Sequence, residues 1–314
     1  MTHKDNGSPR RIGIELEFAG LTVADTSALL DRQFDAAIEL RSRHDVTADI
    51  PALGEAEIAL DTRHAKHQPQ DTALTAKVRD MAGDAASLVV PTEITAPPIE
   101  IAQAGLIDEM VDTLRAAGAR GTRAAPTNAF AMQLNIEAAS MEPAAILAIL
   151  RSFLLLEDWL RDEIEVDRAR RALGFEHAVP ADFRRMVFDP AYAPTAASLI
   201  DDYLAANPTR NRALDLLPIL AEIDGDRVRR ALPEEKIKAR PAYHYRLPDC
   251  RIDEAGWSPR QDWMRWLAVE RLAADHTLLE SAMREQRTLL EGPRTGFFLS
   301  QALAEASISL RRSL

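Results

Sequence analysis

The segment from Arg11 to Phe18, with the sequence RIGIELEF, alternates apolar and polar side chains. This two-residue period is typical of a half-buried β-strand whose apolar face packs against a core. Glu15 and Glu17 then lie on the opposite face with Cα atoms about 7 Å apart, because a strand rises about 3.3 Å per residue. Two parallel carboxylates repel each other and are best tolerated in water or around a hard cation such as Mg²⁺, which prefers oxygen ligands. The segment predicts either a solvated edge strand or one side of a cation site.

The charge balance argues against two classes of partner. The chain has 38 Lys and Arg residues against 49 Asp and Glu residues, a formal net charge of −11, so we expect neither a nucleic-acid nor a membrane partner. The single cysteine, Cys250, fits a reducing cytoplasm. The N-terminus is polar and unlike a secretory signal, and the most apolar run, residues 144–156, is interrupted by Arg151 and too short for a membrane span. We expect a cytoplasmic protein, and the sequence leaves its oligomeric state open.

Strands and helices alternate in the first half of the chain, whereas the second half is mainly helical. We expect strands at residues 11–18, 37–43, 55–61, 88–95, 127–137 and 242–247. We expect helices at residues 25–34, 71–86, 100–117, 142–171, 195–206, 212–222 and 258–290. Strands interrupted by helices require a layered α+β or α/β arrangement. The prediction is one α+β domain over residues 1–314. It has a curved, mainly antiparallel sheet in residues 10–140 with helices on one face, and appended helices in residues 141–314.

Four further segments carry polar residues that suit the chemistry of a site. They are EIALDT at 57–62, PTEITAPP at 91–98, MQLNIE at 132–137 and PAYHYRL at 241–247. Gln133 and Asn135 share one strand face, where amides can hydrogen-bond phosphate, ribose or substrate but cannot transfer protons. Arg246 offers a planar fork for phosphate. Each segment is also compatible with a structural role, as a solvated strand face, a turn aspartate or a salt-bridged arginine.

Together with GIELEF, these segments resemble the amidoligases, carboxylate–amine ligases with a glutamine-synthetase-like fold that are related to the glutamate–cysteine ligases. The likeness extends over residues 10–270. It implies an active site on the concave face of the sheet, where Glu15, Glu17 and Glu93 would bind Mg²⁺ and, through it, the phosphates of ATP. The chain has no Gly-x-Gly-x-x-Gly or Walker loop. That absence fits a fold in which cations and sheet side chains hold the nucleotide.

The resemblance also implies roles for other residues. It places Asp61 near the reaction centre as a base and Arg246 at the transferring phosphoryl group. Arg210 and Asn211 resemble a segment that contacts the substrate carboxylate, although a basic helix start would look the same. The four residues therefore define expected catalytic and substrate-binding positions.

Three positions depart from the family pattern. Gln133 and Asn135 stand on a strand that commonly carries one or two histidines, and His244 replaces a glutamate. We expect all three to contact the bound nucleotide. A neutral imidazole at position 244 could bind a transition metal, which predicts that Mn²⁺ supports activity at least as well as Mg²⁺.

The function implied by the resemblance is ATP- and Mg²⁺-dependent amide-bond formation. The γ-phosphoryl group would pass to a carboxylate, and an amine would attack the resulting acyl phosphate. Two alternatives stay open: an amide hydrolase or deamidase on the same scaffold, and a non-catalytic nucleotide-binding protein. The substrates would be a small-molecule or peptide carboxylate and an amine, whose identities the sequence does not give.

Overall fold

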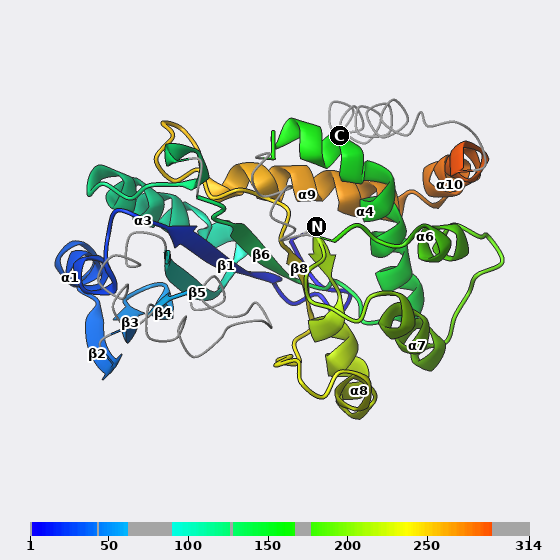
Figure 1. Cartoon of the computed structure of the whole chain (residues 1–314), viewed down its shortest axis with the longest axis horizontal. Coiled ribbons are helices and arrows are strands. Elements are labelled where there is room, and N and C mark those ends of the chain that lie inside the picture. The colour runs from blue at the N-terminus through cyan, green and yellow to red at the C-terminus, as the bar shows by residue number, and fades with distance from the viewer. Residues whose placement is uncertain (1, 43, 62–89, 126–127, 167–176, 291–314) are drawn as a thin grey trace, which may run out of the picture.

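The computed structural model describes residues 2–42, 44–61, 90–125, 128–166 and 177–290 (Figure 1). Within these ranges, eight strands form one antiparallel sheet with the order β2-β3-β4-β5-β1-β6-β8-β7. The strands are β1 (Arg11–Phe18), β2 (Ala37–Ser42), β3 (Asp45–Ile50), β4 (Gly54–Leu60), β5 (Thr92–Glu100), β6 (Met132–Glu137), β7 (Leu214–Asp215) and β8 (Ala242–Tyr245). The two halves of the chain therefore share one sheet. The expected helix at 71–86 and the last residues of the one at 142–171 lie outside the described residues.

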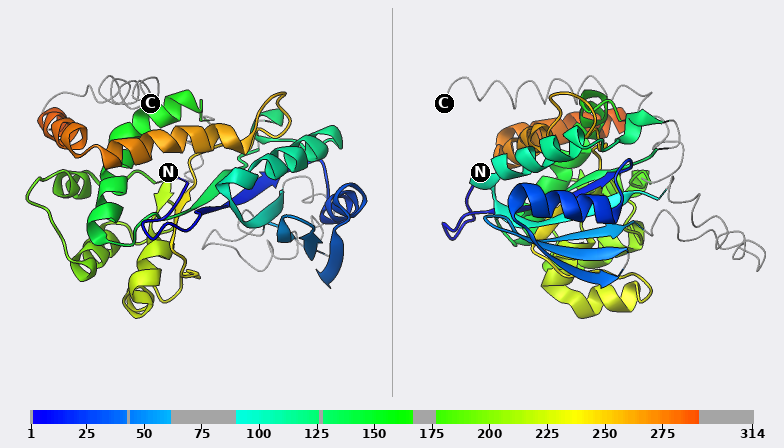
Figure 2. Two further views of the ribbon diagram at one scale, coloured as in Figure 1. Left: turned by 180° about the vertical axis from the view of Figure 1, so that it is seen from behind. Right: turned by 90° about the vertical axis from the view of Figure 1, so that its left-hand side faces the viewer.

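Helices cover the apolar face of the sheet and extend beyond its β7 edge. They are α1 (Val23–Phe34), α3 (Gly105–Ala116), α4 (Pro143–Glu163), α6 (Ala181–Val187), α7 (Ala196–Ala206), α8 (Leu217–Ala231), α9 (Pro259–Ala274) and α10 (His276–Leu290), with 3₁₀ turns η1 (Ile101–Gln103) and η2 (Thr122–Ala124). α4 packs along α9, α1 packs on β3 and β4, and α8 lies beside β8 (Figures 1 and 2). No helix in the described ranges has the length and apolar character needed to cross a membrane. The predicted α+β architecture with an antiparallel sheet is confirmed.

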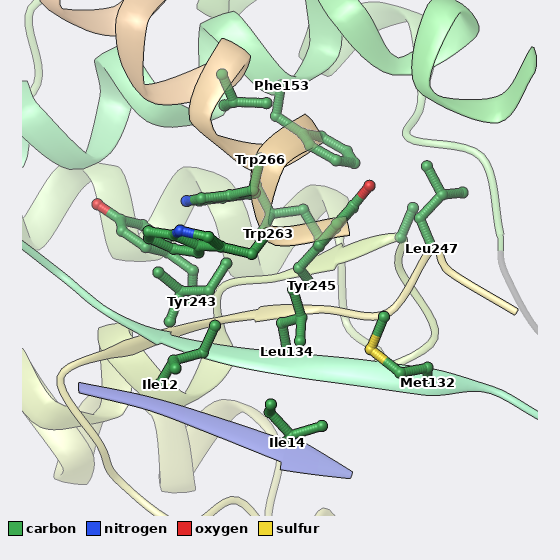
Figure 3. Close-up of a cluster of buried hydrophobic side chains, with 14 of the residues drawn as sticks. Ile12, Ile14, Met132, Leu134, Phe153, Tyr243, Tyr245, Leu247, Trp263 and Trp266 are labelled. Carbon is green, nitrogen blue, oxygen red and sulfur yellow. The ribbon is translucent and has the colours of Figure 1, made fainter. Parts of the chain in front are cut away.

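The core lies between the sheet and the helices α4 and α9. Figure 3 shows Trp263 and Trp266 of α9 above Leu134 and the other apolar side chains of β1 and β6. Trp266 is fully buried, and its ring centroid lies 5.4 Å from that of Tyr245 in β8. Each such aromatic side chain contributes about 2–3 kcal/mol of hydrophobic stabilisation. This packing holds β8 in the sheet and so fixes the position of the residues on its other face.

β5 runs through Pro97 and Pro98, whereas the strand predicted from the sequence ends at residue 95. The register with β1 shifts between Ile12 and Ile14, so that Pro97 and Pro98 lie opposite Gly13. A proline cannot donate to the ladder, and it is tolerated in a sheet at such a bulge. The prolines therefore mark an irregularity inside the strand rather than its end.

Two helices of the second half differ from the prediction. The expected helix at 258–290 is two helices, because Asp275 is non-helical (φ −93°, ψ 86°) and its Oδ1 accepts a hydrogen bond from the amide of Leu278 at 2.9 Å. This side-chain contact begins a new helix, α10. The expected helix at 212–222 is also wrong at its start. β7 (Leu214–Asp215) lies within the expected helix, and α8 begins only at Leu217, with a proline in its first turn.

Candidate active site on the polar face of the sheet

The face of the sheet opposite α4 and α9 carries most of the predicted site residues. Residues that oppose each other in an antiparallel pair project to the same face with neighbouring side chains. The opposed pairs are Glu17 and Glu93, Glu15 and Gln133, and Asn135 and His244. Pairing of β5, β1, β6 and β8 therefore brings carboxylates, amides and an imidazole onto one surface.

Three carboxylates meet where β4, β5 and β1 lie side by side. One oxygen from each of Glu17, Asp61 and Glu93 lies within 4.8 Å of the other two. Asp61 directly follows β4, and its amide donates to the carbonyl of Pro91 at 2.9 Å, which fixes the end of the strand. Glu17 Oε2 accepts a hydrogen bond from the amide of Ala131 at 2.8 Å. Glu17 and Asp61 are only 7% and 4% exposed, so water screens the repulsion within this acidic cluster poorly.

The acidic cluster fits a hard divalent cation. Carboxylate oxygens are preferred ligands of Mg²⁺, and two ligands on opposite sides of the ion are about 4.2 Å apart at a ligand distance of about 2.1 Å. Oxygens within 4.8 Å of one another are close to that spacing. Glu15, Glu17 and Glu93 are the metal ligands expected from the family resemblance. The structure brings Glu17 and Glu93 together with Asp61, and among the described residues Glu15 does not join them.

Glu15 belongs instead to a network of amides. Its Oε1 accepts hydrogen bonds from Gln133 Nε2 at 2.9 Å and Asn135 Nδ2 at 2.8 Å. Gln133 Nε2 also lies 2.5 Å from Asn135 Oδ1 and 3.0 Å from His244 Nδ1. Gln133 and Asn135 are 4% and 6% exposed. The amide nitrogens of two residues expected to contact the nucleotide are thus directed at the carboxylate of Glu15.

His244 is held uncharged by its surroundings. Burial disfavours the imidazolium, and the positive charges of Arg246, Arg210 and Arg240 add to this effect, lowering the pKa of His244 from its ordinary 6.5 to about 2. The ring is therefore neutral throughout the physiological pH range.

Two arginines share one buried carboxylate at the β8–β7 edge. Asp215 of β7 is fully buried, and its Oδ2 lies 3.1 Å from Arg246 Nη2 and 3.5 Å from Arg210 Nε. Asp215 Oδ1 accepts from the amide of Leu217 at 2.9 Å, at the start of α8. Two guanidinium groups against one carboxylate leave a net positive charge. Asp215 is not among the residues expected at the site, because the sequence predicts a helix at 212–222. The available signal is an aspartate followed by a proline that begins a helix.

Asn211 lies apart from this basic cluster. Its side chain is exposed. Its backbone amide donates to Thr209 Oγ1 at 3.1 Å, and its backbone carbonyl accepts from the amide of His177. Of the two residues expected to bind a substrate carboxylate, the described structure joins Arg210 alone to Arg246.

Charge changes sign across the sheet in the order of the strands. Carboxylates lie on β1, on β5 and after β4, neutral amides lie on β6, and arginines gather around β8 and β7. Such a surface can hold a divalent cation at one side and an anionic group at the other, a few strands away.

Comparison with known proteins identifies the family. Residues 8–268 match the family model described as "Putative amidoligase enzyme". No curated protein and no solved structure matches the chain. The matched region contains every candidate residue from Glu15 to Arg246. The chain belongs to the amidoligase family, which indicates a ligase function.

Proposed function

We propose that this protein is an ATP- and Mg²⁺-dependent ligase that activates a carboxylate as an acyl phosphate and joins it to an amine. The observation that carries the proposal is the change of charge across the polar face. A nucleotide phosphate chain with a bound divalent cation needs carboxylates on one side and fixed cations on the other, which is the order found from β4 to β7.

The acidic cluster would hold the cation. Glu17, Asp61 and Glu93 supply three carboxylates from three neighbouring segments. When bound, Mg²⁺ would neutralise the phosphate oxygens and orient the transfer of the γ-phosphoryl group. This assignment gives Asp61 a metal-binding role in place of the catalytic base expected from the resemblance.

The basic edge would bind the transferring group and the substrate. The ion pair with Asp215 fixes the orientation of Arg246, whose planar guanidinium matches phosphate oxygens geometrically. We assign Arg246 to the phosphoryl group in transit and the more exposed Arg210 to the carboxylate of the substrate. The carboxylate and the amine can be small molecules or peptides.

Glu15, Gln133 and Asn135 would position the site. Their mutual hydrogen bonds link β1 to β6, and the further contact of Gln133 reaches His244 on β8. Hydrogen bonds among buried polar side chains restrain the strands that carry them. The network therefore sets the separation between the acidic cluster and the basic edge.

The test is ADP release from purified protein incubated with ATP, Mg²⁺ and a panel of carboxylates and amines. A ligase forms ADP only when both a carboxylate and an amine are present. A hydrolase on this scaffold would release an amine without ADP, and a nucleotide-binding protein would form neither product.

Glu17→Gln is the test variant for the cation site, and Asp226→Asn is its matched control. Glu17→Gln removes a carboxylate from the acidic cluster and is expected to abolish ADP release. Asp226 is an exposed residue of α8 paired with Arg229, and its variant is expected to retain full activity. ADP formation that survives in Glu17→Gln would contradict the assignment of the cation site.

A further inference from the structure

The orientation of the Gln133 amide is determined by Glu15. Its Nε2 lies 2.9 Å from Glu15 Oε1 and 2.5 Å from Asn135 Oδ1. If the amide were flipped, its oxygen would face two other oxygens, one of them a carboxylate, and no hydrogen bond would form. A donor nitrogen therefore points from Gln133 toward β8.

This orientation fixes the tautomer of His244. Gln133 Nε2 lies 3.0 Å from His244 Nδ1, and the guanidinium nitrogen Nη2 of Arg246 lies 3.5 Å from the same atom. Both neighbours are donors, and an arginine cannot accept a hydrogen bond. A proton on His244 Nδ1 would find no acceptor in these two groups, so Nδ1 is the unprotonated nitrogen, and because the ring is neutral its one ring proton is on Nε2.

The Nε2–H group has no hydrogen-bond partner within the part of the chain that the structure describes. His244 is 5% exposed. An unpaired buried donor costs about 1–3 kcal/mol, and such groups in native proteins call for an explanation such as a catalytic role or a bound species. The surrounding charges indicate which species would satisfy this donor. Arg246, Arg210 and Arg240 are all close enough to act on the imidazole, so the local charge favours an anionic oxygen as the acceptor.

We infer that His244 Nε2–H donates a hydrogen bond to an anionic oxygen of the bound ligand, a phosphoryl or a carboxylate oxygen, and is not a metal ligand. The inference concerns the same site as the proposed function and extends it. A glutamate at this position would offer only acceptor oxygens at neutral pH, whereas the Nε2–H of His244 is a donor. The exchange converts an acceptor that suits a cation into a donor that suits an anion. It also removes the basis for expecting His244 to favour Mn²⁺.

The first measurement determines the tautomer directly. A long-range ¹H–¹⁵N spectrum of protein labelled in histidine distinguishes the protonated from the unprotonated ring nitrogen, and His244→Gln identifies the resonances of His244. We expect a neutral ring protonated at Nε2 at neutral pH. A proton on Nδ1, or on both nitrogens, would overturn the inference.

The second measurement compares two amide variants, each of which replaces one of the two ring nitrogens of His244. The nitrogen of His244→Gln stands near the position of Nε2, whereas the amide of His244→Asn reaches only the position of Nδ1. Inorganic phosphate and acetate are titrated separately, in the absence of metal, to distinguish a phosphoryl from a carboxylate subsite. We expect at least one anion to shift the Nε2 resonance in the natural protein. Its affinity should fall about ten- to a hundredfold in His244→Asn, as for loss of one hydrogen bond to a charged group, and should be largely kept in His244→Gln.

Binding of Mn²⁺ to the same variants separates the anion role from a metal role. We expect Mn²⁺ affinity to be unchanged in His244→Asn. Equal anion affinity in both variants, no binding of either anion to the natural protein, or a loss of Mn²⁺ affinity in His244→Asn would each overturn the inference. These outcomes are independent of the ligase assay. Failure to form ADP would refute the proposed function while leaving the tautomer and the anion affinities as measured.

Discussion

At the scale of single residues, Arg246 offers the most direct test of the chemistry. Arg246→Lys keeps the positive charge but loses the planar fork that matches phosphate oxygens. We expect kcat to fall about 100-fold, which corresponds to about 2.7 kcal/mol of transition-state stabilisation, with little change in nucleotide affinity. Steady-state kinetics and nucleotide titration measure the two effects separately.

Arg229→Lys provides the control for this substitution. Arg229 is an exposed arginine of α8 paired with Asp226. Its variant is expected to keep the natural kcat. Full activity in Arg246→Lys as well would return Arg246 to a purely structural ion pair with Asp215.

His244 predicts a specific dependence of stability on pH. Its pKa is lowered to about 2 in the folded protein, whereas in the unfolded chain it is near the ordinary value of about 6.5. Between these two values the unfolded state binds a proton that the folded state does not, so the free energy of unfolding falls as the pH drops below about 6.5. The loss attributable to His244 is about 2 kcal/mol at pH 5, at about 1.4 kcal/mol per pH unit.

Urea denaturation of the natural protein and of His244→Gln at pH 7 and pH 5 measures this term. The other titrating groups are common to both proteins, so the difference between them isolates the imidazole. A decrease of the same size in both proteins between pH 7 and pH 5 would contradict the depressed pKa.

Single residues also show what a strand pattern can and cannot predict. Alternation places Glu15 and Glu17 on the same face, as the structure has them, because it depends only on the geometry of one strand. It cannot say which neighbours each glutamate meets. Glu17 opposes a carboxylate and Glu15 opposes an amide, and this difference depends on the register between strands that are far apart in the sequence.

At the scale of elements, the ion pair between the start of β1 and α9 is a critical connection. Arg10 and Glu270 are 1% and 5% exposed. Arg10 Nη1 donates to Glu270 Oε2 at 2.9 Å, and Arg10 Nη2 donates to Glu270 Oε1 at 2.6 Å. Trp266 Nε1 donates to the same carboxylate at 2.9 Å. Glu270→Gln removes the negative charge from this buried pair. We expect this variant to lose about 3–5 kcal/mol of unfolding free energy, measured by chemical denaturation.

Glu280→Gln is the matched control for this ion pair. Glu280 lies in α10 and forms a long, exposed contact of 3.8 Å with Arg284. Exposed pairs of this kind contribute little, so we expect its stability to be close to that of the natural protein. An equally small effect in Glu270→Gln would show that Arg10 finds other compensation.

The elements most easily missed are those whose stability comes from pairing rather than from local pattern. β7 has two residues and exists because β8 lies beside it. β3 is not among the strands expected from the sequence, yet it pairs with both β2 and β4. Helix starts, by contrast, depend on local signals such as the proline of α8. The helix predicted at 212–222 starts too early because the apolar run used to place it begins before Leu217, the first residue of α8.

At the scale of the whole molecule, ligand binding should appear as added stability. A ligand that binds only the folded state at 100 times its dissociation constant raises the unfolding free energy by about 2.7 kcal/mol. We expect Mg²⁺ with a non-hydrolysable ATP analogue to produce a thermal shift of this origin. The shift should be largely lost in Glu17→Gln and in Asp61→Asn, whose substitutions also relieve repulsion in the metal-free protein.

Glu15→Gln distinguishes the cation set found in the structure from the one expected from the sequence. Its carboxylate accepts two amide hydrogen bonds and lies outside the acidic cluster. We expect this variant to be less stable without ligand and to keep most of the shift with Mg²⁺ and nucleotide. Loss of the whole shift in Glu15→Gln would restore Glu15 as a metal ligand.

The overall class of fold was accessible from the sequence, whereas the map of charge on its polar face was not. Alternating strands and helices are local features and predict an α+β antiparallel architecture. The gradient from carboxylates to arginines depends on the strand order β4-β5-β1-β6-β8-β7. That order brings together segments from both halves of the chain, and no local pattern encodes it.

The position of β8 in this order has a consequence for how the protein is made. β8 pairs with β6 across more than 100 residues of sequence, and β7 is attached to the sheet through β8. Contacts this distant form late, because the entropy of closing a long loop must be offset before they stabilise the chain. During synthesis the pairing of β1, β4 and β5 can therefore precede that of β8. A chain that ends before residue 240 lacks β8, the arginine edge and the core helix α9, so we expect the proposed activity only from the complete fold.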